Sequence, residues 1–172
     1  MKKPSIISVG KRESLCWIRC ESKGSFFNSS VIKQWVDEQF VQEEKNFVMD
    51  LEECTGMDST FMGNMVDLAV RATSVGGKLQ VVDASDKCVS LLEGLGIASL
   101  MEINPVNAEW EENIDAIRSD LTMIEASAAI DKAQHVYDTH KKLCEADAGN
   151  REKFSTVIDC FEAEQAKANK AK

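Results

Sequence analysis

The sequence is poor in residues that interrupt regular structure, with only 2 prolines and 9 glycines among its 172 residues. This scarcity excludes a collagen-like or low-complexity chain. No apolar run approaches the roughly 20 residues that a membrane-spanning helix requires. The first ten residues include two lysines, but Pro4, Ser5 and Ser8 interrupt an apolar stretch that is too short for a signal peptide. We therefore expect a cytoplasmic protein without membrane insertion.

Basic residues are also in the minority. The 20 Lys and Arg residues stand against 29 Asp and Glu residues, which gives a net charge of −9. Such a chain repels a phosphate backbone unless a local basic stripe attracts it, and the sequence contains no such stripe. Nucleic acid is therefore not an expected partner. The 6 cysteines are scattered rather than arranged as a disulfide framework, which favours reduced thiols.

The first half of the chain alternates between strand and helix patterns. Residues 15–20 place alternate side chains on two faces, as a half-buried strand does. Residues 28–42 have apolar positions at helical spacing after a group of capping residues at 28–30. The short apolar run at 47–51 is typical of a strand that is buried on both faces. These patterns indicate an α/β domain.

The same alternation continues after a predicted turn at residues 55–59. A helix then runs to Gly76 and Gly77, and residues 78–83 form a strand parallel to the previous one. A short helix capped by Ser85 or Asp86 follows, and residues 97–103 form a loop and an edge strand. We therefore predict a mixed β-sheet flanked by α-helices over residues 5–104.

After Pro105 the composition changes, because glycine is absent until Gly149 and Ala, Glu, Asp and Lys dominate. Apolar residues at steps of four and three from Trp110 to Ala128 predict one helical seam, and residues 130–144 predict a second. A final helix capped by Asn150 follows. Residues 105–172 are thus predicted to be an α-helical C-terminal extension. It either packs on the domain or itself as a hairpin, or projects to pair with another subunit. We favour packing within the chain, together with a contribution to a homodimer.

Four segments carry the most specific pattern in the sequence. Residues 48–51 read VMDL, residues 55–63 read TGMDSTFMG, residues 76–79 read GGKL and residues 91–96 read LLEGLG. In this combination, residues 10–104 resemble the STAS domain of anti-sigma factor antagonists. That family usually has glycine two residues after the serine and then leucine. Here Phe61 and Met62 stand at those positions, and the glycine is Gly63.

The resemblance implies a binding module that takes part in signal transduction and transcription regulation, without enzymatic activity, cofactor or metal. Ser59 matches the family's phosphorylated serine, with Thr60 as an alternative phosphoacceptor. The implied partners are an anti-sigma factor serine kinase of the GHKL type and a phosphatase. The unmodified protein would capture the kinase, and phosphorylation by that kinase would reverse the capture. The implied surface for this partner consists of Asp58, Ser59, Thr60, Phe61, Met62 and Gly63.

Physical chemistry supports a switch at Ser59 independently of the resemblance. A serine in the first turn of a helix, beyond the carboxyl end of a parallel strand, is presented where α/β sheets bind partners. Phosphate there adds a charge of about −1.5 to −2, which a helix N-terminus tolerates but a docked partner does not. The simpler alternative is that Asp58 or Ser59 only caps the helix.

Other functions have weaker support in the sequence. One alternative is a STAS scaffold or transporter-associated subunit, in which Ser59 is never phosphorylated and the extension carries assembly. Cys16, Cys20, His135 and His140 are four potential zinc ligands, but their spacings are not typical of zinc sites. An enzyme would require a deep cavity that unites Cys54 with a histidine and an acid.

Overall fold

A computed structural model describes residues 6–125 and 131–172. Its strands are β1 (Ile6–Arg12), β2 (Leu15–Gly24), β3 (Asn46–Asp50), β4 (Cys54–Met57), β5 (Lys78–Val82), β6 (Glu102–Ile103) and β7 (Thr122–Met123). Within the described residues they form one sheet in the order β6-β5-β3-β2-β1-β7, and β4 pairs with β2 beside this path. β1 is antiparallel to β2 and β7, whereas the pairs among β2, β3, β4, β5 and β6 are parallel. The predicted mixed sheet is confirmed.

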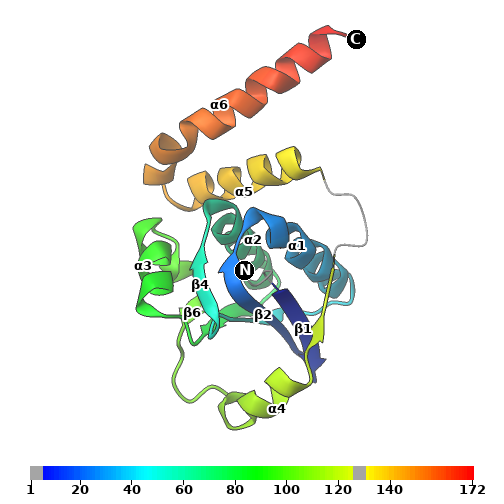
Figure 1. The fold of residues 1–172 in the computed structure, drawn as a ribbon, viewed down its shortest axis with the longest axis vertical. Helices are drawn as coiled ribbons and strands as arrows, with labels where there is room; N and C mark the ends of the chain where they lie inside the picture. Colours follow the sequence, from blue (N-terminus) through cyan, green and yellow to red (C-terminus); the bar gives the residue numbers. More distant parts are fainter. Residues whose placement is uncertain (1–5, 126–130) are drawn as a thin grey trace.

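Helices lie on both sides of this sheet (Figure 1). They are α1 (Phe26–Val41), α2 (Ser59–Ser74), α3 (Asp86–Gly94), α4 (Ile114–Ser119), α5 (Lys132–Ala146) and α6 (Gly149–Lys170). α1 and α2 pack against the main core, and α4 lies on the other side of the sheet. α5 crosses α2 on the side away from α4, and α6 projects from the molecule.

Strand β3 lies in the middle of the sheet and is buried on both faces. Phe47 and Met49 belong to the main core, while Val48 points to the other side and packs in a second cluster with Trp17 and Trp110. The rings of Trp17 and Trp110 meet edge to face, with centroids 5.3 Å apart. The burial predicted for residues 47–51 is therefore confirmed.

The continuous helical seam predicted from Trp110 onward is wrong. A 3-10 turn at Glu111–Asn113 and the short helix α4 are followed by strand β7, which pairs with β1. Trp110 and Ile117 are buried because each packs separately onto the sheet, and their spacing imitates a helix. The end of the predicted seam, residues 126–128, lies outside the described residues.

Three strands, β1, β4 and β7, were absent from the sequence prediction, and one cap was misplaced. β1 overlaps the N-terminal segment that was discussed above only as too short for a signal peptide. β4 occupies most of the turn predicted at residues 55–59. Asn150 does not cap α6. It lies inside the first turn, where its side-chain amide donates hydrogen bonds to the carbonyl oxygens of Leu95 and Leu143. The predicted cap Ser85 is confirmed, since its hydroxyl accepts a hydrogen bond from the Cys88 amide.

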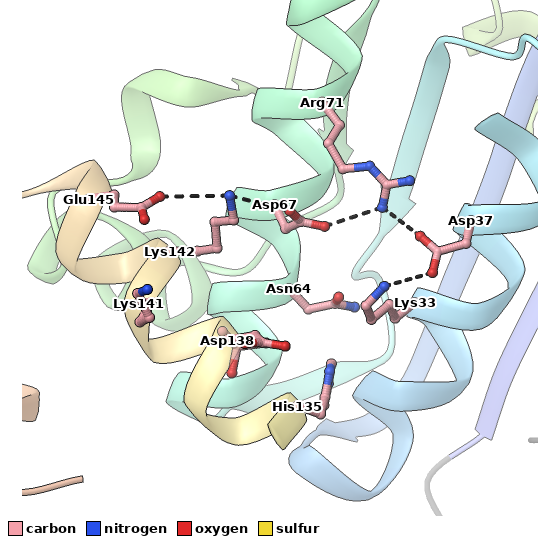
Figure 2. Close-up of a pocket in the computed structure, with 11 residues that line it drawn as sticks. Lys33, Asp37, Asn64, Asp67, Arg71, His135, Asp138, Lys141, Lys142 and Glu145 are labelled. Carbon is pink, nitrogen blue, oxygen red and sulfur yellow. Dashed lines mark hydrogen bonds and ion pairs between the residues drawn. The ribbon is translucent and has the colours of Figure 1, made fainter. Parts of the chain in front are cut away.

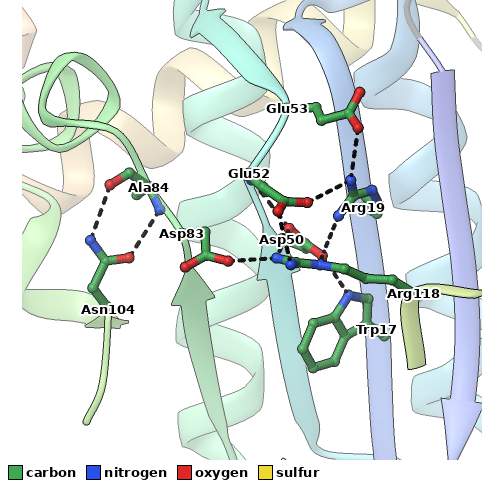
Figure 3. A network of polar contacts seen from close by, with 9 residues as sticks. All are labelled: Trp17, Arg19, Asp50, Glu52, Glu53, Asp83, Ala84, Asn104 and Arg118. Carbon is green, nitrogen blue, oxygen red and sulfur yellow. Dashed lines mark hydrogen bonds and ion pairs between the residues drawn. The ribbon is translucent and has the colours of Figure 1, made fainter. Parts of the chain in front are cut away.

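A buried carboxylate joins the sheet to α4 (Figure 3). Asp50, at the end of β3, is fully buried. Its Oδ2 accepts hydrogen bonds from Trp17 at 3.1 Å, Arg19 at 2.9 Å and Arg118 at 2.8 Å, and its Oδ1 accepts from Arg118 at 3.0 Å. Burial by itself raises the pKa of Asp50. The hydrogen bonds from Arg118 and the Glu52 amide, with the charges of both arginines, outweigh burial and hold this pKa below 3.8.

We expect Asp50→Asn to lower the free energy of unfolding by about 3–5 kcal/mol, because it leaves Arg19 and Arg118 without their shared buried anion. The matched control is Asp83→Asn. Asp83 also binds Arg118, but its side chain is 50% exposed, so the loss should be about 1 kcal/mol or less. Urea denaturation measures both losses, and equal losses would contradict this account.

The lowered pKa of Asp50 also predicts how the stability of the fold changes with pH. A carboxyl group whose pKa is lower in the folded state stabilises the fold above its ordinary value of 3.8. That contribution should be lost as the pH falls below 3.8, and Asp50→Asn should reduce the acid sensitivity of unfolding.

Candidate functional site

Asp58 holds the start of α2 in place. Its Oδ1 accepts the amide hydrogen of Phe61 at 2.9 Å, which is the hydrogen bond of a helix N-cap. Its Oδ2 accepts the amide hydrogen of Phe26 at 2.8 Å, so the same carboxylate also holds the first residue of α1. The backbone amide of Asp58 donates to Gly24 in β2. Asp58 therefore has the capping role that the sequence suggested, and it fixes the position of Ser59.

Ser59 is the first residue of α2 and is partly buried. Its Oγ lies 2.9 Å from Nε2 of His140 in α5. The other ring nitrogen of His140, Nδ1, lies 2.6 Å from the carbonyl oxygen of Val136 and donates its hydrogen there. In the neutral ring Nε2 is then an acceptor, so the Ser59 hydroxyl donates to it. The candidate phosphoacceptor is thus occupied by a contact from the C-terminal extension.

The six residues predicted to meet a partner lie together at the start of α2, and we call them the Ser59 face. The expectation that all six are on the surface is wrong for four of them: Thr60, Phe61, Met62 and Gly63 are buried. The ring of Phe61 is fully buried, and it lies where a side chain at Gly24 would be. Gly63 is buried because α5 lies directly on it.

Helices α2 and α5 approach each other backbone to backbone at Gly63. A Cβ atom at this position would overlap the carbonyl oxygen of Thr139. Glycine inside a helix is less favourable than alanine by roughly 0.5–1 kcal/mol, so its presence requires a reason such as this contact. Gly63 in the middle of a predicted helix was therefore a signal of close helix packing in the sequence.

A second contact between a histidine and a serine lies beside the first. Nε2 of His135 in α5 is 2.9 Å from Oγ of Ser29 in α1, and His135 is 3% exposed. Burial lowers the pKa of His135 below 6.5, and the charge of Lys33 acts in the same direction, against Asp138 and Asp67. The sequence contains 2 histidines, and both lie in α5 and contact a serine of the domain.

A cavity of about 490 Å³ lies between α1, α2 and α5 (Figure 2). Charged side chains line it and pair across it. Asp37 of α1 accepts hydrogen bonds from Lys33 and from Arg71 of α2, both at 2.6 Å. Lys142 of α5 lies 3.9 Å from Asp67 of α2. Part of the contact between α5 and the domain is therefore polar and incompletely packed.

The other candidate residues do not form a site. His135 and His140 contact serines, while Cys16 and Cys20 are buried in β2, and no group suited to hold a metal ion occurs in the described part of the chain. A hydrogen bond with Cys20, together with burial, raises the pKa of Cys54, which disfavours a reactive thiolate.

No helix within residues 6–125 and 131–172 is long and apolar enough to cross a membrane.

The family follows from comparison with known proteins. Residues 7–110 match the family model of the STAS domain. The chain belongs to the STAS domain family. No curated protein matches the sequence. The residues matched to the STAS family end before α5 and α6 begin. The helix that covers the Ser59 face, α5, is therefore not part of the match, and neither is α6.

Solved structures share the STAS fold at low identity. TM1081 of Thermotoga maritima is 17% identical, with 65% of this chain and 94% of that chain covered and a TM-score of 0.54. The anti-sigma factor antagonist SpoIIAA of Bacillus, in its unphosphorylated form, is 17% identical, with 65% and 97% covered and a TM-score of 0.51. An anti-sigma factor antagonist from Mycobacterium paratuberculosis is 13% identical, with 69% and 99% covered and a TM-score of 0.54.

The lowered pKa of His135 predicts that α5 binds the domain less tightly in acid. Because the group is neutral and buried when α5 is docked, docking is strongest above pH 6.5 and weakens as the pH falls below it. Amide hydrogen exchange of α5, expressed as protection factors, should show several-fold lower protection at about pH 5.5 than at about pH 7.5. In His135→Gln this dependence should largely disappear. An unchanged dependence in that variant would assign it to another group.

Proposed function

We propose that this STAS protein is an anti-sigma factor antagonist of the cytoplasm, which captures a kinase-type anti-sigma factor and loses that capture when Ser59 is phosphorylated. The observation that carries the proposal is the position of Ser59. Its hydroxyl lies at the first residue of a helix that Asp58 caps and anchors, within a STAS fold. The solved structures of Bacillus SpoIIAA, which include a phosphorylated form, support the same reading.

The proposed modification is a transfer of the γ-phosphoryl group of ATP by a GHKL-type serine kinase. A bond forms between Ser59 Oγ and the γ-phosphorus while the bond from that phosphorus to the bridging β–γ oxygen breaks, and ADP leaves. The hydroxyl proton passes to a base of the kinase. A phosphatase reverses the change when water attacks the phosphorus, which releases inorganic phosphate and restores the Ser59 hydroxyl.

Phosphate on Ser59 acts on binding rather than on folding. The first turn of α2 has backbone N–H groups without intrahelical partners and the positive end of the helix dipole, which stabilise an anion there by about 0.3–1 kcal/mol. A partner docked over the same residue would bury that charge beside the Asp58 carboxylate, at a cost of several kcal/mol. The fold therefore survives modification while the complex does not.

A second candidate is a STAS scaffold that is not phosphorylated and assembles through its extension. The observation in its favour is α6, whose residues are almost all exposed. α6 and α5 together form an apolar groove, and the side chains that line it include Tyr137, Val157 and Phe161. Purification with bound partners separates the two functions, because an antagonist brings down a kinase and a scaffold forms a large homo-oligomer or joins a membrane complex.

Ser59 can be tested with a candidate GHKL-type serine kinase. Incubation with that kinase and ATP should place one phosphate on Ser59, located by mass spectrometry, and Ser59→Ala should abolish it. Thr60→Ala is the control for the neighbouring hydroxyl, and the phosphate in that variant should still be located on Ser59. Phosphate that remains in Ser59→Ala and disappears in Thr60→Ala would transfer the role to Thr60.

The charge switch is tested by affinity for the same kinase. Ser59→Asp should weaken binding about 100-fold or more relative to the unmodified protein, because the partner must bury an unpaired carboxylate. Ser59→Asn has nearly the same size without the charge, so it should bind much more tightly than Ser59→Asp. If the two variants bind equally well, charge at this position does not control the complex.

A further inference from the structure

We propose that α5 is an intramolecular occupant of the Ser59 face, which must leave this face before the kinase can bind or phosphorylate the protein. The inference rests on the proposed function, since it describes how access to that same site is regulated. It assigns a role to a helix that lies outside the residues matched by the STAS family.

α5 covers two of the residues proposed to meet the partner, Ser59 and Gly63. His140 contacts the hydroxyl of Ser59, and the backbone of Thr139 lies against Gly63 four residues farther along α2. His140 and Thr139 are each 4% exposed, and the ring of Phe154 in α6 also packs against His140. A kinase therefore cannot use the same face while α5 is docked.

The contact with Ser59 also blocks the chemistry directly. An Oγ to Nε2 distance of 2.9 Å is that of a direct hydrogen bond, which leaves no space for a phosphorus atom between the two groups. The side chain of His140 therefore stands where the γ-phosphoryl group would approach. Transfer to Ser59 requires the ring to move, and phosphoserine cannot keep this contact.

The interface of α5 combines one strong anchor with several weak contacts. Leu143 is fully buried in the main core and is the anchor. The remaining contacts include the two pairs of histidine and serine, and a Lys142–Asp67 ion pair at the edge of the polar cavity. Water and solvated ions can replace such polar contacts at low cost, so the helix can leave while the sheet and α4 stay folded.

The far end of α5 is held at a different place in the domain. Asn150 donates to the carbonyl oxygen of Leu95, and Lys153 donates to that of Gly94, both at the end of α3. Asp147 packs closely on Gly96. These contacts tie the junction of α5 and α6 to α3, so α5 stays near the Ser59 face after it leaves and can return to it.

Occupation by α5 reduces the apparent affinity for a partner in proportion to the fraction of molecules that are open. A face that is open in about one molecule in ten binds about tenfold more weakly than a free face. Release of α5 by substitution should therefore raise kinase affinity and the phosphorylation rate of Ser59 together. The same change in the open fraction should raise the chemical accessibility of position 59 without any kinase.

Accessibility can be measured on the full chain through Ser59→Cys and a maleimide, with each cysteine followed by mass spectrometry. Cys160 on α6 is exposed and serves as the internal reference. A thiol at a helix N-terminus is intrinsically reactive. Slow labelling of position 59 would therefore show that α5 covers the thiol, not that the thiol itself is unreactive. We expect labelling about tenfold or more slower than at Cys160, and several-fold faster when Leu143→Ser is added.

The matched control is Ala133→Ser, which places the same residue at an exposed position of α5 and should leave the rate unchanged. The Trp17–Trp110 pair lies in the second core on the α4 side, and its near-ultraviolet circular dichroism reports whether the sheet stays folded. If Leu143→Ser loses this signal, His140→Ala replaces it, because that change weakens the docking of α5 by removing the contact with Ser59 and places no polar group in the core.

The kinase arm of the experiment measures affinity and Ser59 phosphorylation in the chain with its native serine. Leu143→Ser or His140→Ala should raise both about tenfold or more, and Ala133→Ser should not. Position 59 labelled as fast as Cys160 in the otherwise unchanged chain would overturn the role of α5, as would equal kinase binding by the native chain and the release variants.

The labelling experiment tests whether α5 covers position 59, and the kinase experiment tests whether the uncovered face binds a kinase. Slow labelling that speeds up on release supports α5 as an occupant of the face. If no variant with α5 released binds or is phosphorylated by the kinase, the proposed function is overturned, and with it the regulation of a kinase site.

Discussion

The backbone contact between α2 and α5 at Gly63 is the constraint on which the covered site depends. A side chain at this position would hold the two helices apart, because its first carbon would meet the Thr139 carbonyl oxygen. The hydrogen bond between His140 and Ser59 requires the same close approach. One glycine thus sets how much of the candidate phosphoacceptor reaches the solvent. The cover is a property of helix packing rather than of the serine itself.

The two sides of the sheet have different kinds of contact, and this difference fits a domain that stays folded while one helix moves. On the α4 side, Asp50 is fully buried and paired with two arginines, and the second core closes around the tryptophan pair. On the α5 side, a polar cavity interrupts the packing between the helices. The main core under α1 and α2, together with the contacts of Asp58 to Phe26 and Phe61, positions Ser59. The polar part of the contact between α5 and the domain is where occupants of the Ser59 face can exchange.

Structural features that depend on only a few neighbouring residues could be predicted from the sequence. The buried strand β3, the helix after Asp58 and the cap at Ser85 follow from patterns within a few residues, so they were found. β4 was missed because it is four residues long and contains the glycine of a predicted turn. The position of α5 depends on a surface some 80 residues away in the chain, as the separation of 81 between Ser59 and His140 illustrates. No periodicity can encode that choice.

Hydrogen exchange of the protein with and without its kinase shows whether α5 leaves the Ser59 face on binding. We expect opposite changes in two helices: amides of α5 should lose protection when the kinase binds, while amides at the start of α2 should gain it. Binding that protects α2 and leaves the protection of α5 intact, or increases it, would contradict the account, because both would then occupy the Ser59 face at once.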